Sequence, residues 1–188
     1  YESLLPVLGP QADQTPVYTG ETTIQHRLDA ALAPVTDLDA KKQIVNQFKD
    51  HETFLIDLSH ILEQTDILKL SKQLTLLVEA VIGTAIRLLM EELIRRHGTP
   101  MTVGIIPAHY AVFGLGKLGG AALGYASDIE LLLVYSDNGL TDGPSPISNS
   151  DFFSELVREL RQFIVSKRSG IFDIDLRLRP YGSDGPLA

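Results

Sequence analysis

Hydrophobic positions in the first half of the chain recur at helical spacing. Between residues 37 and 62 the apolar residues fall at intervals of three, four and seven, which is the period of one helix face. Asp37 or Asp39 is a suitable N-cap for this segment. A wider apolar stripe runs from residue 71 to residue 97, and Gly98 and Pro100 follow it as stop signals. The pattern predicts two long amphipathic helices, and the second is expected to pack beneath the segments that follow it.

After residue 107 the pattern changes to shorter segments with other periods. Three strands are predicted, over residues 109–115, 128–135 and 171–178. A glycine-interrupted short helix lies between the first two strands, and a longer helix over 151–167 precedes the third. The expected fold class is therefore α/β (α+β), with a strand–helix–strand–helix–strand domain behind a helical extension.

The pattern also suggests how the chain is divided. Residues 1–36 are expected to form an extended arm, because prolines and glycines interrupt their beginning. A helical extension is expected over 37–100, and the α/β domain over 101–188. The sequence begins with Tyr1 rather than Met and stops within a pattern. We therefore expect a piece of a longer protein, with its α/β domain truncated at the C-terminus.

Composition narrows the classes of function. The 188 residues are 44% hydrophobic with a formal net charge of −8, so a packed core is expected and a broad nucleic-acid surface is not. The chain has no cysteine, which excludes disulfides, zinc–thiolate sites and thiol nucleophiles. Glu79 and Arg87 interrupt the most apolar stretch, so no membrane span is expected.

A glycine-rich turn follows the first predicted strand, with the sequence GLGKLGG over residues 114–120. It satisfies the G-x-G-x-x-G pattern of a Rossmann-type dinucleotide-binding module, and Asp137 lies near the distance expected of a ribose-binding acid. Two features count against this alternative. The intervening helix is short, and the nearby acids cluster at the beginning of the second strand rather than past its end.

Acidic residues two apart mark the start of the second strand. Asp128 and Glu130 point to the same side of it, where two carboxylates repel each other unless a cation lies between them. Such an oxygen-rich pair suits Mg²⁺ shared with phosphates. The alternative is a solvated strand edge with two surface acids.

The third strand repeats this arrangement. One side presents Asp173, Asp175, Arg177 and Arg179, whereas the other side is apolar. These charges could form surface salt bridges worth ~0–1 kcal/mol. Alternatively, Asp175 supplies a further metal ligand and the arginines bind phosphate oxygens. A glycine turn, two acids on one strand and one on another are the parts needed for phosphoryl or nucleotidyl transfer.

These segments also resemble a known family. The strings GLGKLGGAALGYASDIELLLVY and FDIDLRLRPYGSDGPLA are similar to the two signatures of the glutamine synthetase adenylyltransferases, and the preceding helices over about 40–82 fit as well. The resemblance implies a DNA polymerase β-like nucleotidyltransferase fold in a cytoplasmic enzyme that regulates nitrogen assimilation. Members have two related halves, one attaching AMP to a tyrosine of glutamine synthetase and the other removing it with phosphate.

The resemblance carries roles onto particular residues. The metal-binding and catalytic acids fall on Asp128, Glu130 and Asp175, with Mg²⁺ or Mn²⁺ as the ion. The positions that contact nucleotide or phosphate are Gly119, Gly120, Ser127, Lys117, Arg177 and Arg179. The implied partners are glutamine synthetase, ATP or ADP, phosphate and, through the full-length protein, a PII-type signalling protein.

Two departures from the family pattern matter. Glu130 stands where the family usually has Asp, and Ala122 where Glu is common. One extra methylene can displace a metal enough to slow the reaction. A catalytically silent nucleotide-binding domain, or an enzyme with another acceptor, therefore stays open. The ending LRLRPYGSDGPL is closer to the AMP-removing half.

Overall fold

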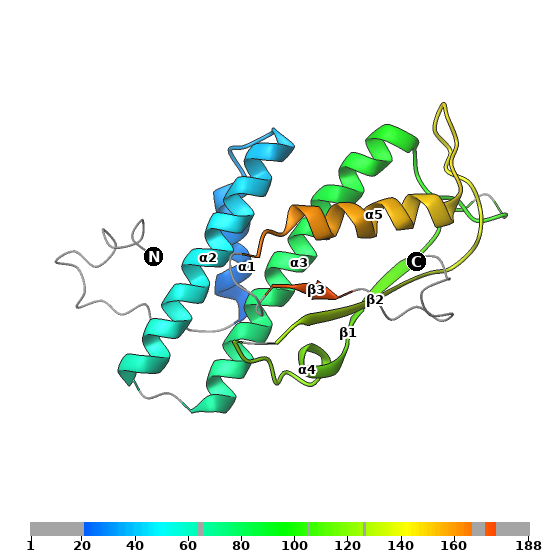
Figure 1. Ribbon diagram of the computed structural model, residues 1–188. Helices are drawn as coiled ribbons and strands as arrows, with labels where there is room; N and C mark the ends of the chain where they lie inside the picture. Colours follow the sequence, from blue (N-terminus) through cyan, green and yellow to red (C-terminus); the bar gives the residue numbers. More distant parts are fainter. Residues whose placement is uncertain (1–20, 64–65, 105, 126, 167–171, 176–188) are drawn as a thin grey trace. The chain divides into compact units, whose positions relative to one another are not determined.

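A computed structural model describes residues 21–63, 66–104, 106–125, 127–166 and 172–175 (Figure 1). The chain separates into two compact units, Tyr1–Ala80 and Val81–Ala188, which we describe one at a time. In chain order the elements are α1 (Glu21–Leu32), α2 (Leu38–Glu63), α3 (Ile67–His97), β1 (Tyr110–Gly114), α4 (Gly116–Gly119), β2 (Ile129–Tyr135), α5 (Asn149–Phe163) and β3 (Ile174–Asp175). The predicted mixed α/β class with helices first is confirmed.

Helices α1 and α2 pack together in the first unit. The backbone N–H of Ala40 donates to Asp37 Oδ2 at 2.8 Å, so the predicted N-cap of α2 is confirmed. Arg27 of α1 makes a two-pronged bond to Glu52 of α2, with nitrogen–oxygen distances of 2.8 and 2.7 Å. Because Glu52 is only 1% exposed, this pairing compensates a buried charge at the helix interface.

The predicted extended arm over residues 1–36 is wrong for residues 21–32, which form α1. Ile24, Leu28 and Leu32 are buried and lie four residues apart, so they form one apolar helix stripe. The prolines that suggested an arm at the start of the chain all precede residue 20 and do not reach this segment. Residues 1–20 lie outside the part that the structure describes. The division into an arm, an extension and a catalytic domain stays a prediction.

Helix α3 begins in the first unit and ends in the second. By length and composition alone it could cross a membrane, but 78% of its most apolar window is buried inside the structure. A core helix of a folded domain gives the same result, so this finding does not indicate a membrane span. The helix ends at His97, and Gly98 follows with a left-handed φ of +84°.

A three-stranded sheet with the order β1-β2-β3 forms the centre of the second unit. Strand β1 runs antiparallel to β2, whereas β3 runs parallel to it. The alternate residues Ile129, Leu131 and Leu133 of β2 are buried, which gives the sheet one packed face. Phe153 of α5 stacks on Tyr135 at the end of β2, with ring centroids 4.7 Å apart. Only residues 172–175 of the predicted third strand lie within the described ranges, and β3 occupies two of them.

Ion pairs join α5 to the last turn of α3. Arg96 Nη2 donates to both carboxylate oxygens of Glu159 at 2.8 Å, and Arg96 Nη1 donates to Glu155 Oε1 at 3.0 Å. The hydrogen bond to Glu159 raises the pKa of Arg96 above its usual range. Glu155 also lies 3.3 Å from His97 Nε2. Charged groups therefore connect the two helices beside the sheet.

The segment between β2 and α5 approaches the end of α3 closely. A Cβ at Gly139 would overlap the carbonyl oxygen of Met101, and a Cβ at Gly143 would overlap that of His97. The N–H of Thr99 donates to Asp142 Oδ1 at 2.6 Å. Together with the backbone bonds from Met101 N–H to Leu140 O and from Asp142 N–H to Thr99 O, these contacts hold the segment against the end of α3 and the residues that follow it.

Candidate active site

The backbone brings the three predicted acids together near the start of β2. Glu130 of β2 and Asp175 of β3 are register partners on parallel strands, so their side chains leave the same face. The N–H of Ile129 donates to the carbonyl of Asp173 at 2.8 Å, which holds the two strands together there. Asp128 directly precedes β2 and is exposed. The order of residues along adjacent strands thus agrees with a shared site.

The carboxylates themselves are not gathered around one point. Within the ranges that the structure describes, no group of three or more His, Asp or Glu side chains is placed to hold a metal ion. The carboxylates of Asp128 and Glu130 have no hydrogen bond or ion pair to another described residue, whereas Asp175 does have an interaction. A donor set made only of carboxylate oxygens fits a hard divalent ion in its chemistry.

The glycine turn beside these acids is compact. Helix α4 has only four residues, shorter than predicted, and packs against β1 and β2. The N–H of Gly119 donates to the carbonyl of Leu115 at 3.1 Å, and that of Gly120 to the carbonyl of Gly116 at 3.1 Å. Both N–H groups are therefore used within the turn. A Cβ at Gly119 would lie 2.5 Å from the carbonyl oxygen of Gly114, so this position admits only glycine without rearrangement.

Ser127 closes a second turn just before the acids. Its buried hydroxyl accepts a hydrogen bond from the N–H of Gly124 at 3.0 Å, and its own N–H donates to the carbonyl of Gly124 at 3.0 Å. The side chain thus fixes the chain that leads into Asp128. Ser127 was predicted from the sequence as a phosphate contact, whereas its hydrogen bonds within the turn were not predicted.

The predicted cationic residues are less well defined. Lys117 lies exposed on α4 and has no ion-pair partner in the described part of the chain. Arg177 and Arg179 lie outside the residues that the structure describes. Their assignment to phosphate binding stays a prediction.

The alternative of a dinucleotide-binding module is overturned by the topology. A Rossmann unit needs parallel strands on both sides of its glycine-turn helix, and here β1 and β2 on either side of α4 are antiparallel. Asp137, the candidate ribose-binding acid, instead accepts from the N–H of Val103 at 3.0 Å and from that of Asn138 at 2.7 Å. These bonds give it a structural role in the loop.

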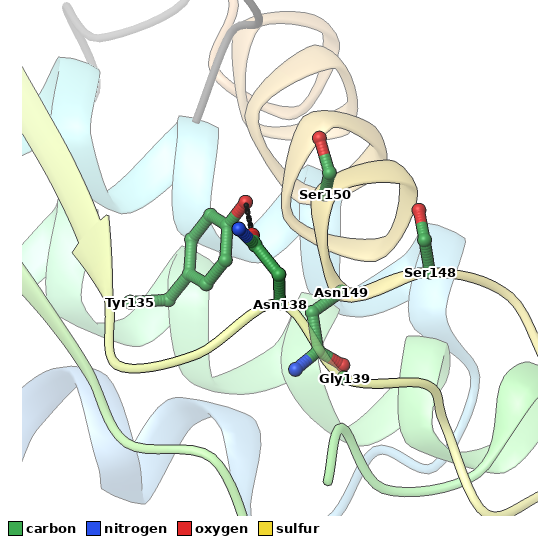
Figure 2. A pocket seen from close by; sticks show the side chains of 6 residues that line it. All are labelled: Tyr135, Asn138, Gly139, Ser148, Asn149 and Ser150. Atoms are coloured by element: carbon green, nitrogen blue, oxygen red, sulfur yellow. Dashed lines mark hydrogen bonds between the residues drawn. The ribbon is translucent and has the colours of Figure 1, made fainter. Parts of the chain in front are cut away.

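A cavity of about 420 Å³ opens at the other end of β2 (Figure 2). It is lined by Tyr135, Asn138, Gly139, Ser148, Asn149 and Ser150. The Tyr135 hydroxyl donates to Asn138 Oδ1 at 3.1 Å. The Asn149 side chain points away from the serine hydroxyls in this view, and its amide nitrogen donates to the carbonyls of Met101 and Asp137. Because Tyr135 and Glu130 lie at opposite ends of β2, the cavity is not part of the acidic site.

The mixed sheet with N-terminal helices, together with paired acids beside a glycine turn, is consistent with a nucleotidyltransferase-like domain. The chain belongs to the glutamate-ammonia ligase adenylyltransferase family, whose family model matches residues 5–188. This is a family of glutamine synthetase adenylyltransferases that act in nitrogen regulation.

Similar proteins carry the name bifunctional glutamine synthetase adenylyltransferase/adenylyl-removing enzyme. The chain is 40% identical to the protein from Bordetella pertussis over 128 residues, which is 66% of this chain and 14% of the relative. It is 36% identical to the Idiomarina loihiensis protein and 30% identical to that of Shewanella frigidimarina, each over 158 residues covering 82% of this chain. The chain spans 14–17% of the length of these relatives.

Proposed function

We propose that this chain is a metal-dependent nucleotidyltransferase domain that removes AMP from a tyrosine of glutamine synthetase. The observation that carries the proposal is the register of Glu130 with Asp175 beside the glycine turn, in a member of this family. The bifunctional relatives are named for both the adding and the removing activity. The ending over residues 176–187 favours the AMP-removing half through its resemblance to that half.

Each candidate residue has a role in this proposal. Asp128, Glu130 and Asp175 would hold Mg²⁺ or Mn²⁺, which neutralises charge on the reacting phosphate. Lys117, Arg177 and Arg179 would balance the remaining negative charge of the phosphates. The turns at Gly119, Gly120 and Ser127 precede the start of β2, and in this proposal a phosphate would approach the chain there.

The reaction balances without a protein base. An oxygen of hydrogen phosphate forms a bond to the adenylyl phosphorus, and the bond from phosphorus to the tyrosine oxygen breaks. The products are ADP and the free tyrosine, and the proton of hydrogen phosphate ends on the tyrosine oxygen. Because the attacking group arrives already anionic, the chain has to position it and to offset its charge.

The direct test uses the whole chain and AMP-modified glutamine synthetase with phosphate and Mg²⁺. The expected result is loss of the AMP mass from the synthetase together with formation of ADP. A parallel reaction with unmodified synthetase and ATP tests the opposite direction, and Asp128→Asn serves as the inactive control. No mass loss from the AMP-modified synthetase and no mass gain by the unmodified one, with a folded protein, would contradict the proposal.

A second candidate is a catalytically silent nucleotide-binding domain of the same fold. It is favoured by Glu130 at a position where the family usually has Asp, and by carboxylates that are not gathered for a metal in the described part of the chain. Such a domain would bind ATP with Mg²⁺ and show a thermal shift but no product. In either case we propose a cytoplasmic setting, with glutamine synthetase and, through the full-length protein, a PII-type signalling protein as partners.

A further inference from the structure

The carboxylate of Glu130 lies against the first residue of α4. A Cβ built on Gly116 would overlap Glu130 Oε2 and would lie 3.1 Å from its carboxylate carbon. Gly116 also has a left-handed φ of +52°, where a side chain is strained in any surroundings. Two separate reasons therefore exclude a side chain at this position, and one of them concerns an acid of the candidate active site.

The main chain fixes this proximity. Strand β1 ends at Gly114 and α4 begins at Gly116, so the turn between them passes beside β2. The N–H of Leu115 donates to the carbonyl of Glu130 at 2.9 Å, which ties the turn to the backbone of this acid. The Glu130 carboxylate has no hydrogen bond or ion pair to any other described residue. Its place is therefore set by packing rather than by a polar bond.

We infer that Gly116 is a positioning residue for Glu130: the missing side chain leaves the space in which the longer acid lies. The inference rests on the proposed function only in treating Glu130 as a metal ligand. Any residue with a Cβ at position 116 would push the carboxylate out of this space. An aspartate at position 130 is one methylene shorter and would reach less far toward the turn. The effect of a side chain at 116 should therefore depend on the length of the acid at 130.

A double-mutant cycle separates this overlap from the backbone strain. Its four proteins are the parent chain, Gly116→Ala, Glu130→Asp and the double variant. The strain at φ +52° is present in both Gly116→Ala proteins and cancels in the cycle. The overlap with Glu130 is present in only one of them. Melting temperature without metal and Mn²⁺ affinity by calorimetry are the two measurements.

The expected result is a coupling between the two positions. Gly116→Ala should lower the melting temperature more in the parent than in the Glu130→Asp background. It should weaken Mn²⁺ binding about fivefold in the parent and less than about twofold in the shorter-acid background, since residues in contact show such coupling. Equal effects in both backgrounds would overturn the inference. If no protein of the four binds Mn²⁺, the proposed metal site fails, and the melting temperatures alone still decide the positioning role.

Two further variants keep the test decisive. Gly116→Asn replaces the alanine variant if that protein does not fold, because asparagine tolerates left-handed backbone but still carries a Cβ. Gly83→Ala is the matched control, since a Cβ there meets nothing within 4 Å. The control should leave Mn²⁺ affinity unchanged, whereas both substitutions at Gly116 should weaken it.

Discussion

Glu130 and Asp175 are register partners on the parallel strands β2 and β3. Their side chains project from the same face of the sheet on adjacent strands, although the two residues are 45 positions apart in the chain. Asp128 directly precedes β2, two residues before Glu130. Because two acidic residues are paired across adjacent strands, the stability of the protein is expected to depend on divalent cations.

Mg²⁺ or Mn²⁺ should raise the melting temperature of the protein. Binding to the native state alone contributes roughly 2.7 kcal/mol at about 100 times the dissociation constant. Asp128→Asn should remove most of this gain, as measured by thermal unfolding with and without metal. Asp173→Asn is the matched control, because Asp173 is a nearby exposed acid that the family pattern does not assign to metal. An equal rise in the parent and in Asp128→Asn would place the ion elsewhere.

The two arginines that follow Asp175 should differ in their effect on nucleotide binding. If Arg177 contacts phosphate in a desolvated site, Arg177→Gln should weaken ATP–Mg²⁺ binding by roughly 1.5–3 kcal/mol. Arg179→Gln should have a smaller effect, because Arg179 precedes Pro180 and Gly182, where the sequence predicts a turn. Calorimetric titration of both variants decides this. If both variants bind ATP–Mg²⁺ within about twofold of the parent affinity, the two arginines do not bind phosphate and form surface salt bridges instead.

Removing the aromatic ring beneath β2 should destabilise the second unit strongly. Phe153 is fully buried and packs on Tyr135 and, edge to face, on Phe152. Phe153→Ala should reduce the free energy of unfolding by about 3–5 kcal/mol, as measured with urea. Val103→Ala is the control, because Val103 is 78% exposed and its loss should stay within about 0.5 kcal/mol. Similar losses for both variants would contradict the packing described above.

Acidification should weaken the end of α3 through Glu92. The hydrogen bond from Arg95 holds the pKa of Glu92 below its ordinary value of 4.5, with support from the charges of Arg95 and Arg96 and against a smaller raising effect of burial. A lowered pKa in the folded state means that the contribution is complete above pH 4.5 and is lost as the pH falls below it.

The measurement is the free energy of unfolding between about pH 5 and pH 3. Glu92→Gln should lose less stability over this range than the parent, by at most about 0.5 kcal/mol because the pair is near the surface. Glu91→Gln, at a neighbouring exposed position, should follow the parent. A Glu92→Gln curve parallel to that of the parent would show that this ion pair does not stabilise the fold.

Regular apolar spacing made most elements predictable. The run from Ile129 to Tyr135 gave β2, and the predicted cap at Asp37 marks a helix start that a local hydrogen bond confirms. Residues 21–32 were predicted as part of an extended arm, because prolines and glycines interrupt the beginning of the chain, whereas the four-residue spacing of Ile24 and Leu28 is typical of a helix. A local pattern of apolar residues predicts a helix or strand well unless the neighbouring residues suggest a different structure more strongly.

The site could be predicted only in part. Alternation along a strand placed Asp128 and Glu130 together, but the register that adds Asp175 comes from pairing between strands. The turn that Ser127 closes and the space that Gly116 leaves depend on contacts across the fold. Gly116, the second glycine of the GLG string, was the only sequence signal for that space, whereas the predicted phosphate contacts were Gly119 and Gly120.

The close backbone contacts at Gly139 and Gly143 have a consequence for how this family can vary. A Cβ at Gly139 would overlap the carbonyl oxygen of Met101, which follows α3, and a Cβ at Gly143 would overlap that of His97, the last residue of α3. An insertion in one of the two contacting segments would change which residues face each other, unless the other segment changed in length as well. Among family members, length differences in these two stretches should therefore occur together or not at all, even though the contacting residues are 38 and 46 positions apart in the sequence.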